Sequence, residues 1–218
     1  MEKADGMAAG VAEPVAVTQT YYACFCRADQ LEEGQFEGLL MGLDPVRREK
    51  TMARRSREDR LLSLAVGLLL RRCLRRWGIA EAPVYDGQGK PVIPGHPEVF
   101  VSATHCWPYA GAIVSSSPCG IDLERRRPIE AVVGRWFLPE EQAVCHGDPA
   151  LAMDIWCRKE CIIKCFGLRD WKRLDTFALP EGYVFTGVPL LGFSFQTLTR
   201  GNAGGVEEVG MEKLKVEN

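Results

Sequence analysis

The sequence lacks any apolar run long enough to cross a membrane. Its longest such run, Leu61 to Leu70, has ten residues and is followed directly by Arg71 and Arg72, whereas a helix that spans a hydrocarbon core of roughly 30 Å needs about 20 apolar residues. The opening stretch, MEKADGMAAGVAEP, also lacks the basic and apolar regions of a secretory signal. We therefore expect a cytoplasmic protein without a membrane partner.

Net charge is also scarce. The formal net charge is -2 and the sequence pI is about 6.0, so the chain as a whole has no field that would recruit nucleic acid or an anionic membrane. With 46% hydrophobic and 26% charged residues over a length of 218, the composition is that of an ordinary globular protein. Any electrostatic partner must therefore be sought in local clusters of charge.

The nine cysteines include no Cys-x-x-Cys pair, and their odd number argues against a complete disulfide framework. Cys157, Cys161 and Cys165 recur one helical turn apart, but a metal site would need further ligands that are not nearby. We expect them to be small buried hydrophobic side chains, and in a cytoplasmic protein the thiols stay reduced.

Each half of the chain combines strand patterns with one long helical pattern. The first long helical stretch begins at Pro45 after a capping Asp44, breaks near Ser56 and ends near Trp77, before Gly78. Glycine and proline are so dense between 84 and 97 that only loops and short edge strands fit there. We expect strands at 15–26, 99–103, 110–115, 119–124, 177–179, 183–186 and 193–198, and further helices at 34–43, after Pro128, from Pro139 and from about Met153 to Gly167.

This order of elements predicts an α+β fold. We expect two pseudo-symmetric subdomains, each a small, mostly antiparallel sheet packed on a long helix. The predicted divisions are a loose N-terminal tail at 1–14, an N-terminal subdomain at 15–116, a C-terminal subdomain with acidic motifs at 117–200, and a polar, mobile tail at 201–218.

Two acids alternate within the strand expected at 119–124. Because Asp122 and Glu124 are separated by one residue, strand alternation points both carboxylates to the same face, and Gly120 leaves room for close approach. Paired oxygen ligands of this kind suit Mg²⁺, which keeps waters and takes phosphate oxygens. The other interpretation is a solvated strand edge, and these six residues alone favour it.

A second charged pair lies in the helix expected to end at Gly167. Glu160 and Lys164 stand one turn apart on one side of that helix, and the simplest interpretation is a surface ion pair. Because the residues around them make the helix mostly apolar, we interpret the two charges as lining a cleft. A carboxylate and an ammonium placed there would complete a metal site and hold a phosphate.

Basic residues form the remaining candidates. Lys90, in a Gly-Lys-Pro turn, and His105, near a strand end, are each weak signals, since such residues are more often exposed or structural. Seven of the fourteen residues from Arg47 to Arg60 are basic, which usually marks a solvated helix face. Polyphosphate, an acidic protein surface or nucleic acid would also fit this run, although no aromatic residue interleaves it as single-strand binding requires.

Taken together and in this order, these motifs resemble the 4'-phosphopantetheinyl transferases, of the two-subdomain type that activates surfactin-like peptide synthetases. That family is recognised by a Gly-Ile/Val-Asp-x-Glu strand and a Trp/Phe-x-x-Lys-Glu-x-x-x-Lys helix, which stand here complete at 120–124 and 156–164. The family's Gly-Lys-Pro motif matches at 89–91, and its Ser-His-Ser appears as Thr-His-Cys at 104–106. The likeness spans roughly 44–167.

The resemblance implies a reaction and a role for individual residues. A serine of an acyl or peptidyl carrier protein attacks the β-phosphorus of coenzyme A and releases adenosine 3',5'-bisphosphate, the holo-[acyl-carrier-protein] synthase type of transfer. The implied ligands of Mg²⁺, or of Mn²⁺ with the same preference for oxygen, are Asp122, Glu124 and Glu160. Glu160 is also the implied general base, with Lys164 beside it as a second catalytic residue. The implied contacts to coenzyme A come from Arg47, Lys50, Lys90, Thr104, His105 and Lys164.

The sequence departs from the family pattern without losing a metal ligand. Thr104 and Cys106 replace two serines, and Leu61 and Leu62 stand where a basic residue is expected. One alternative is a non-catalytic protein of the same fold that binds coenzyme A or a carrier protein, but clustered carboxylates without a metal repel one another and lower stability. A second alternative, a nucleic-acid-binding helix, explains neither acidic motif. The resemblance also implies a monomer.

Overall fold

The computed structural model describes residues 20–87, 89–168, 170 and 174–216. The tail predicted at 1–14, and the first residues of the strand predicted at 15–26, lie outside this range. The strands are β1 (Tyr21–Arg27), β2 (Val84–Tyr85), β3 (Pro91–Val92), β4 (Phe100–Cys106), β5 (Tyr109–Ser115), β6 (Gly120–Arg125), β7 (Tyr183–Gly187), β8 (Phe193–Arg200) and β9 (Gly204–Glu208). The helices are α1 (Phe36–Met41), α2 (Pro45–Met52), α3 (Arg57–Arg76), α4 (Glu130–Trp136), α5 (Pro139–Cys145), α6 (Pro149–Phe166) and α7 (Met211–Val216), with 3-10 turns at Ala28–Gln30 and Glu33–Gln35.

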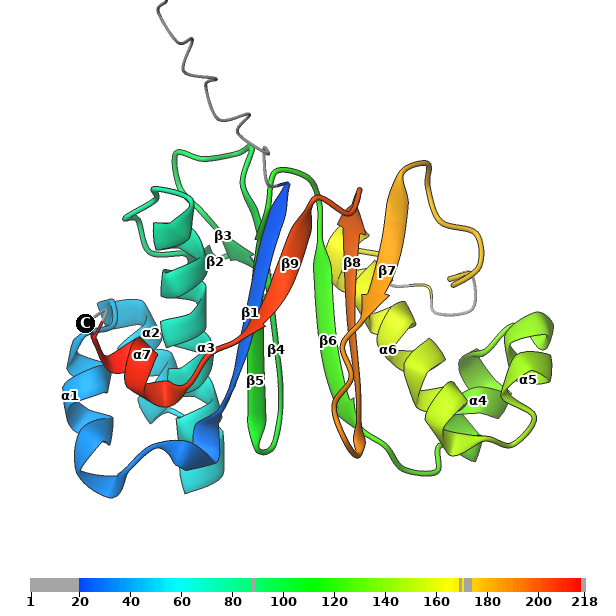
Figure 1. Ribbon diagram of the computed structural model, residues 1–218, viewed down its shortest axis with the longest axis horizontal. Helices are drawn as coiled ribbons and strands as arrows, with labels where there is room; N and C mark the ends of the chain where they lie inside the picture. The colour runs from blue at the N-terminus through cyan, green and yellow to red at the C-terminus, as the bar shows by residue number, and fades with distance from the viewer. Residues whose placement is uncertain (1–19, 88, 169, 171–173, 217–218) are drawn as a thin grey trace, which may run out of the picture.

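Two sheets stand face to face in the middle of the molecule, and each carries a long helix on its outer face (Figure 1). The first sheet has the order β4-β5-β1-β9 and the second has the order β6-β8-β7. Every strand pair is antiparallel except β1 with β9. The predicted α+β class, with small and mostly antiparallel sheets on long helices, is therefore confirmed; the subdomain bounds at 15–116 and 117–200 stay a prediction.

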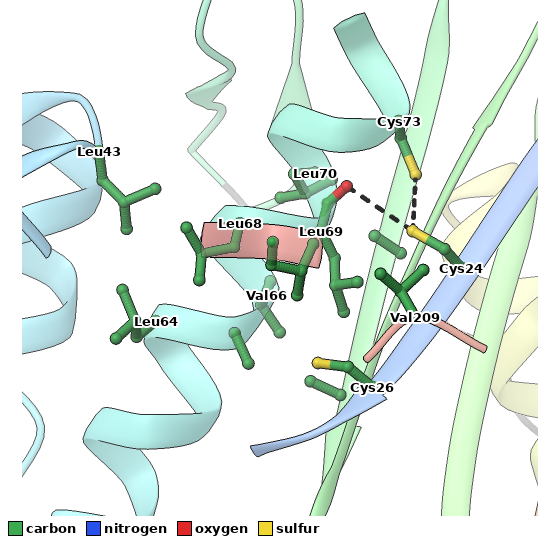
Figure 2. Packing of buried hydrophobic residues seen from close by; sticks show 14 of the residues in the cluster. Cys24, Cys26, Leu43, Leu64, Val66, Leu68, Leu69, Leu70, Cys73 and Val209 are labelled. Carbon is green, nitrogen blue, oxygen red and sulfur yellow. Dashed lines mark hydrogen bonds between the residues drawn. The ribbon is translucent and has the colours of Figure 1, made fainter. Parts of the chain in front are cut away.

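The first helical layer is built by the stretch predicted from Pro45 to Trp77. Asp44 caps α2 by accepting a hydrogen bond from a backbone N–H, and Ser56 caps α3 in the same way, so the predicted break at Ser56 is a new helix start. The apolar face of α3 packs on the first sheet (Figure 2). There Cys24 lies with its Sγ 3.5 Å from that of Cys73 and 3.9 Å from the carbonyl oxygen of Leu69.

The second long helix, α6, packs unusually close to β6. A Cβ atom added to Gly120 would lie 2.1 Å from the carbonyl oxygen of Cys161, so only glycine permits this approach. The sequence had led us to expect that Gly120 leaves room for close approach at a metal site. Instead, the backbone of α6 fills the space next to Gly120. Cys157, Cys161 and Cys165 are buried along this contact, as predicted.

The C-terminal residues correct two sequence predictions. The polar stretch at 201–218 was expected to be a mobile tail, but residues 204–208 form β9 beside β1, and Met211 and Leu214 of α7 are buried in the first core. Gly204 makes this possible, because a Cβ there would lie 2.4 Å from the carbonyl oxygen of Tyr21. The strand predicted at 177–179 does not form; those residues are irregular.

None of the helices in the described part of the chain combines the length and the apolarity that crossing a bilayer requires.

Candidate active site

The residues that the sequence singled out for coenzyme contact converge on one cavity. It has a volume of about 320 Å³ and lies between α2, α3, the β2–β3 hairpin, β4 and the C-terminal end of α6. A volume of this size is at the lower end of the range for small-molecule sites. All six predicted contacts line it: Arg47, Lys50, Lys90, Thr104, His105 and Lys164.

The β2–β3 hairpin brings the Gly-Lys-Pro motif to this cavity. The backbone N–H of Lys90 donates to Oδ1 of Asp86 at 2.9 Å, and Gly89 has a φ of +78°, a conformation that favours glycine. Tyr85 pairs with Pro91 across the hairpin. The motif therefore sets the turn geometry that turns Lys90 toward the cavity.

Arg47 lines the cavity but has its guanidinium engaged inside the protein. It is buried, and its Nε and Nη2 both donate to the carbonyl oxygen of Ser63 on α3. Its Nη1 donates to the hydroxyl of Tyr85 at 2.7 Å. Burial is the main cause that lowers its pKa from the ordinary value for arginine. Arg47 thus ties α2 to α3 and to the hairpin, and its predicted contact to a phosphate stays a prediction.

Tyr85 is a cavity residue that the sequence did not single out. Its hydroxyl accepts the hydrogen bond from Arg47, and the Nζ atom of Lys50 lies 3.5 Å from the centre of its ring. This cation–π contact holds the ammonium of Lys50 in place. Burial, followed by the charges of Arg47 and Arg54, lowers the pKa of Lys50. The only signal in the sequence was an aromatic residue five positions before Lys90.

Lys164 stands between this cavity and the acidic strand β6. Its Nζ atom donates to Oδ1 of Asp122 at 2.7 Å and to the carbonyl oxygen of Ile121 at 3.0 Å. The side chain of Asp122 is 6% exposed and that of Lys164 is 27% exposed. Burial is the largest single cause and lowers the pKa of Lys164, but the Asp122 carboxylate, together with Cys161 and Glu160, outweighs it, so the net shift of the pKa is upward. The ion pair therefore joins α6 to β6 at the edge of the cavity.

Two further carboxylates, those of Glu124 and Glu160, lie near Asp122 of this ion pair. Burial and the neighbouring Asp122 carboxylate raise the pKa of Glu124. The same two causes, in the same order, raise the pKa of Glu160 to about 7, and the charge of Glu124 adds to them. Such shifts arise where carboxylates are crowded without enough positive charge to balance them.

A divalent cation suits this donor set. Asp122 Oδ2 is buried and has no hydrogen-bond partner in the described part of the structure, and a buried oxygen of this kind is normally satisfied. Across residues 20–87, 89–168, 170 and 174–216, no group of three histidine, cysteine, aspartate or glutamate side chains is placed so that it could hold a metal ion. The arrangement matches Mg²⁺, which takes few carboxylates and completes its shell with waters and substrate phosphates.

His105 stands exposed at the mouth of the cavity, on β4. Its pKa is lowered from the ordinary value, first by partial loss of solvent and then by the positive charges of Arg54, Lys164 and Arg47. Arg54 follows α2, is itself exposed and lines the same cavity. The cavity mouth is therefore a region of positive potential, which attracts anions.

Lys159 precedes Glu160 in the chain but points away from the cavity. Its Nζ atom lies 2.7 Å from Oε2 of Glu141 on α5, and neither side chain is exposed. It also donates to the carbonyl oxygen of Leu174. This lysine of the Trp-x-x-Lys-Glu motif thus holds α5 and the segment around Leu174 against α6.

Comparisons with known proteins all point to one family. The family model described as the 4'-phosphopantetheinyl transferase superfamily matches residues 118–184, which include the β6 acids and the α6 motif. A 4'-phosphopantetheinyl transferase of Bacillus subtilis is 27% identical over 172 residues, covering 73% of this chain and 77% of the relative. The 4'-phosphopantetheinyl transferase Sfp of Bacillus subtilis strain 168 is 26% identical over 163 residues, covering 68% and 71%, and the 4'-phosphopantetheinyl transferase psf-1 of Bacillus pumilus is 31% identical over 88 residues, covering 38% of each chain. The chain is therefore similar to the 4'-phosphopantetheinyl transferases, over residues 118–184 for the family model and over about two thirds or more of its length for two of these relatives.

Proposed function

We propose that this protein transfers the 4'-phosphopantetheine group of coenzyme A to a serine of an acyl or peptidyl carrier protein. The observation that carries the proposal is the junction between a cavity lined by cations and a cluster of three carboxylates, joined by the Lys164–Asp122 pair. The cations suit the phosphates of coenzyme A, and the carboxylates suit a divalent cation that binds its pyrophosphate.

In this proposal the cavity binds and orients coenzyme A. Lys50, Lys90 and His105 contact its phosphates, and Lys164 lies where the cavity meets the carboxylates. Asp122, Glu124 and Glu160 hold the cation, Mg²⁺ or Mn²⁺. When bound, that cation neutralises charge on the pyrophosphate as the bond to the leaving group breaks.

The transfer itself is a displacement at phosphorus. The carrier serine oxygen forms a bond to the β-phosphorus, the bond to the bridging oxygen of the pyrophosphate breaks, and adenosine 3',5'-bisphosphate leaves. Glu160, half-buried on α6, is the proposed acceptor of the serine proton. A positioned base is typically worth about 10²- to 10⁴-fold in rate, and positioning of the two reactants supplies much of the rest.

The proposal also covers the oligomeric state of the protein, its partners and its location in the cell. We infer a monomer that serves carrier proteins of fatty-acid, polyketide or peptide synthesis and has no nucleic-acid partner. All nine cysteines are free thiols, including Cys24 and Cys73 with their Sγ atoms 3.5 Å apart, and this supports a reducing, cytoplasmic location. A non-catalytic protein that binds coenzyme A or a carrier protein is the competing function.

Intact-mass measurement of purified apo carrier proteins tests the transfer directly. Incubation with this protein, coenzyme A and Mg²⁺ should add the mass of one phosphopantetheine, and EDTA should abolish the gain. Asp122→Ala should be inactive, and Glu160→Gln should lose about 10²- to 10⁴-fold in rate. Glu140→Gln, which changes an exposed carboxylate on α5, is the matched control and should keep full activity. Coenzyme binding without any mass gain, across fatty-acid and peptide-synthetase carriers, would favour the non-catalytic function.

A further inference from the structure

Thr104 bridges the edge strands of the two sheets. Its hydroxyl accepts a hydrogen bond from the backbone N–H of Leu123 at 3.1 Å and donates to Oδ1 of Asp122 at 3.3 Å. The residue is 6% exposed. Because β4 and β6 are the outer strands of different sheets, no strand ladder joins them here. The side chain of Thr104 supplies the link in its place.

The methyl group of Thr104 fixes the direction of its hydroxyl. Thr104 pairs with Gly111 on β5, and a Cβ at Gly111 would lie 3.3 Å from Thr104 Cγ2 and 3.3 Å from Ile121 Cδ1. The methyl group therefore occupies an apolar space that the glycine leaves open between the sheets. A β-branched side chain has few χ1 choices, so seating the methyl there directs the hydroxyl toward β6.

This contact distinguishes the two oxygens of Asp122. Oδ1 accepts hydrogen bonds from both Thr104 and Lys164, whereas Oδ2 is buried without a partner in the described residues. A carboxylate held at one oxygen has its other oxygen fixed in direction as well. The geometry points to Oδ2 as the oxygen that is presented to a cation.

We infer that Thr104 is a positioning residue that orients Asp122 for the divalent cation, and that its hydroxyl is not a contact to coenzyme A. The inference rests on the proposed function for the presence of the cation, and it goes further by assigning the threonine a different role from the one that the family resemblance implies. Groups that orient metal ligands typically contribute 10- to 100-fold in metal affinity.

Binding of Mn²⁺, followed by the loss of the free-ion signal in electron paramagnetic resonance, separates these roles. Thr104→Val keeps the shape of the side chain and removes the hydroxyl, so Mn²⁺ affinity in the presence of coenzyme A should fall by about 10-fold or more. Thr104→Ser keeps the hydroxyl without the methyl group, so its Mn²⁺ affinity should lie between those of the parent and the valine variant. Thr199→Val is the matched control, because Thr199 is a buried threonine on β8 that donates to the carbonyl oxygen of Gly201, outside the site; it should bind Mn²⁺ like the parent.

Coenzyme affinity in EDTA supplies the second readout. Thr104→Val should bind coenzyme A as the parent does, because the hydroxyl faces Asp122. A loss of coenzyme affinity with unchanged Mn²⁺ affinity would overturn the inference. If the valine variant does not fold, Thr104→Ala gives the same comparison, since it only removes atoms. A parent protein that neither binds Mn²⁺ nor modifies any carrier would refute the proposed function itself, whereas an active parent with a fully competent valine variant would refute only the role of Thr104.

Discussion

The imidazole of His105 is exposed at the cavity mouth among positive charges from other elements. Those charges and the partial loss of solvent hold its pKa below the ordinary value of 6.5, so the ring is neutral at neutral pH. Phosphates of bound coenzyme A would surround it with negative charge and raise its pKa again. Binding of coenzyme A should therefore take up a proton. In the pH range between the raised pKa of the complex and the lowered pKa of the free protein, coenzyme affinity should increase as the pH falls.

Calorimetry in two buffers with different ionisation enthalpies measures that proton uptake. Near pH 6.5 the parent should take up a larger fraction of a proton than His105→Gln. The glutamine variant corrects for titration of the coenzyme's own phosphates, which is common to both proteins. Equal uptake by the two proteins would show that His105 does not face the phosphates.

The contact between α5 and α6 depends on the buried pair of Lys159 and Glu141. Neither side chain is exposed, and the carboxylate of Glu141 also accepts hydrogen bonds from Leu138 and Thr176. Removal of the ammonium alone would leave a buried charge without its partner, which typically costs about 3–5 kcal/mol. We expect Lys159→Met to lower the free energy of unfolding by this amount.

Urea denaturation of a double-mutant cycle tests this prediction. Glu141→Gln removes the charge and keeps an acceptor oxygen for one of the two backbone N–H groups, which donate to different oxygens of Glu141. The double variant with Lys159→Met should therefore recover part of the lost stability. If the losses of the two single variants simply add, the two side chains do not interact. Residual transferase activity of the folded Lys159→Met variant would separate this structural role from a catalytic one.

Sequence patterns located the elements well where local chemistry determines them. Asp44, Ser56 and Gly78 mark helix ends whose signals are short-range, and the structure has helix ends at each of them. The stretch at 204–208 carried no such signal, because β9 is held by pairing with β1, which is almost the whole chain away. The polar composition of β9 concealed a contact that only the tertiary fold supplies.

The residues that meet at the cavity were predictable from the sequence, but their geometry was not. The order of the motifs singled out six residues that line the cavity and three carboxylates, although these come from α2, the β2–β3 turn, β4, β6 and α6, but it missed Tyr85. The sequence could not show that Lys159 and Glu160, adjacent on one helix, point to a buried ion pair and to the carboxylate cluster respectively. It also could not show that Thr104 faces Asp122. Side-chain direction at these positions is set by packing between the two halves.

The charge of the whole molecule is nearly balanced, yet exposed arginines gather where α2 meets α3. Arg54, Arg55 and Arg57 are all exposed there, and Arg54 also lines the cavity. An acidic carrier protein that approaches this side would be attracted before contact, which mainly speeds association. Arg55 lies outside the cavity lining, so its effect on the carrier can be separated from any effect on coenzyme A.

Steady-state kinetics at increasing salt should show this separation. At low ionic strength, Arg55→Ala should lower kcat/KM for the carrier by about two- to fivefold, since an exposed pair of charges contributes roughly 0.2–1 kcal/mol, and leave KM for coenzyme A unchanged. The difference from the parent should disappear as salt screens the charges. Arg54→Ala should raise KM for coenzyme A as well, whereas Arg135→Ala, an exposed arginine on α4 on the opposite side of the molecule (Figure 1), should change neither constant. If Arg55→Ala and Arg135→Ala behave alike at every salt concentration, the carrier approaches from another side, and the arginines at the α2–α3 junction are only a solvated surface.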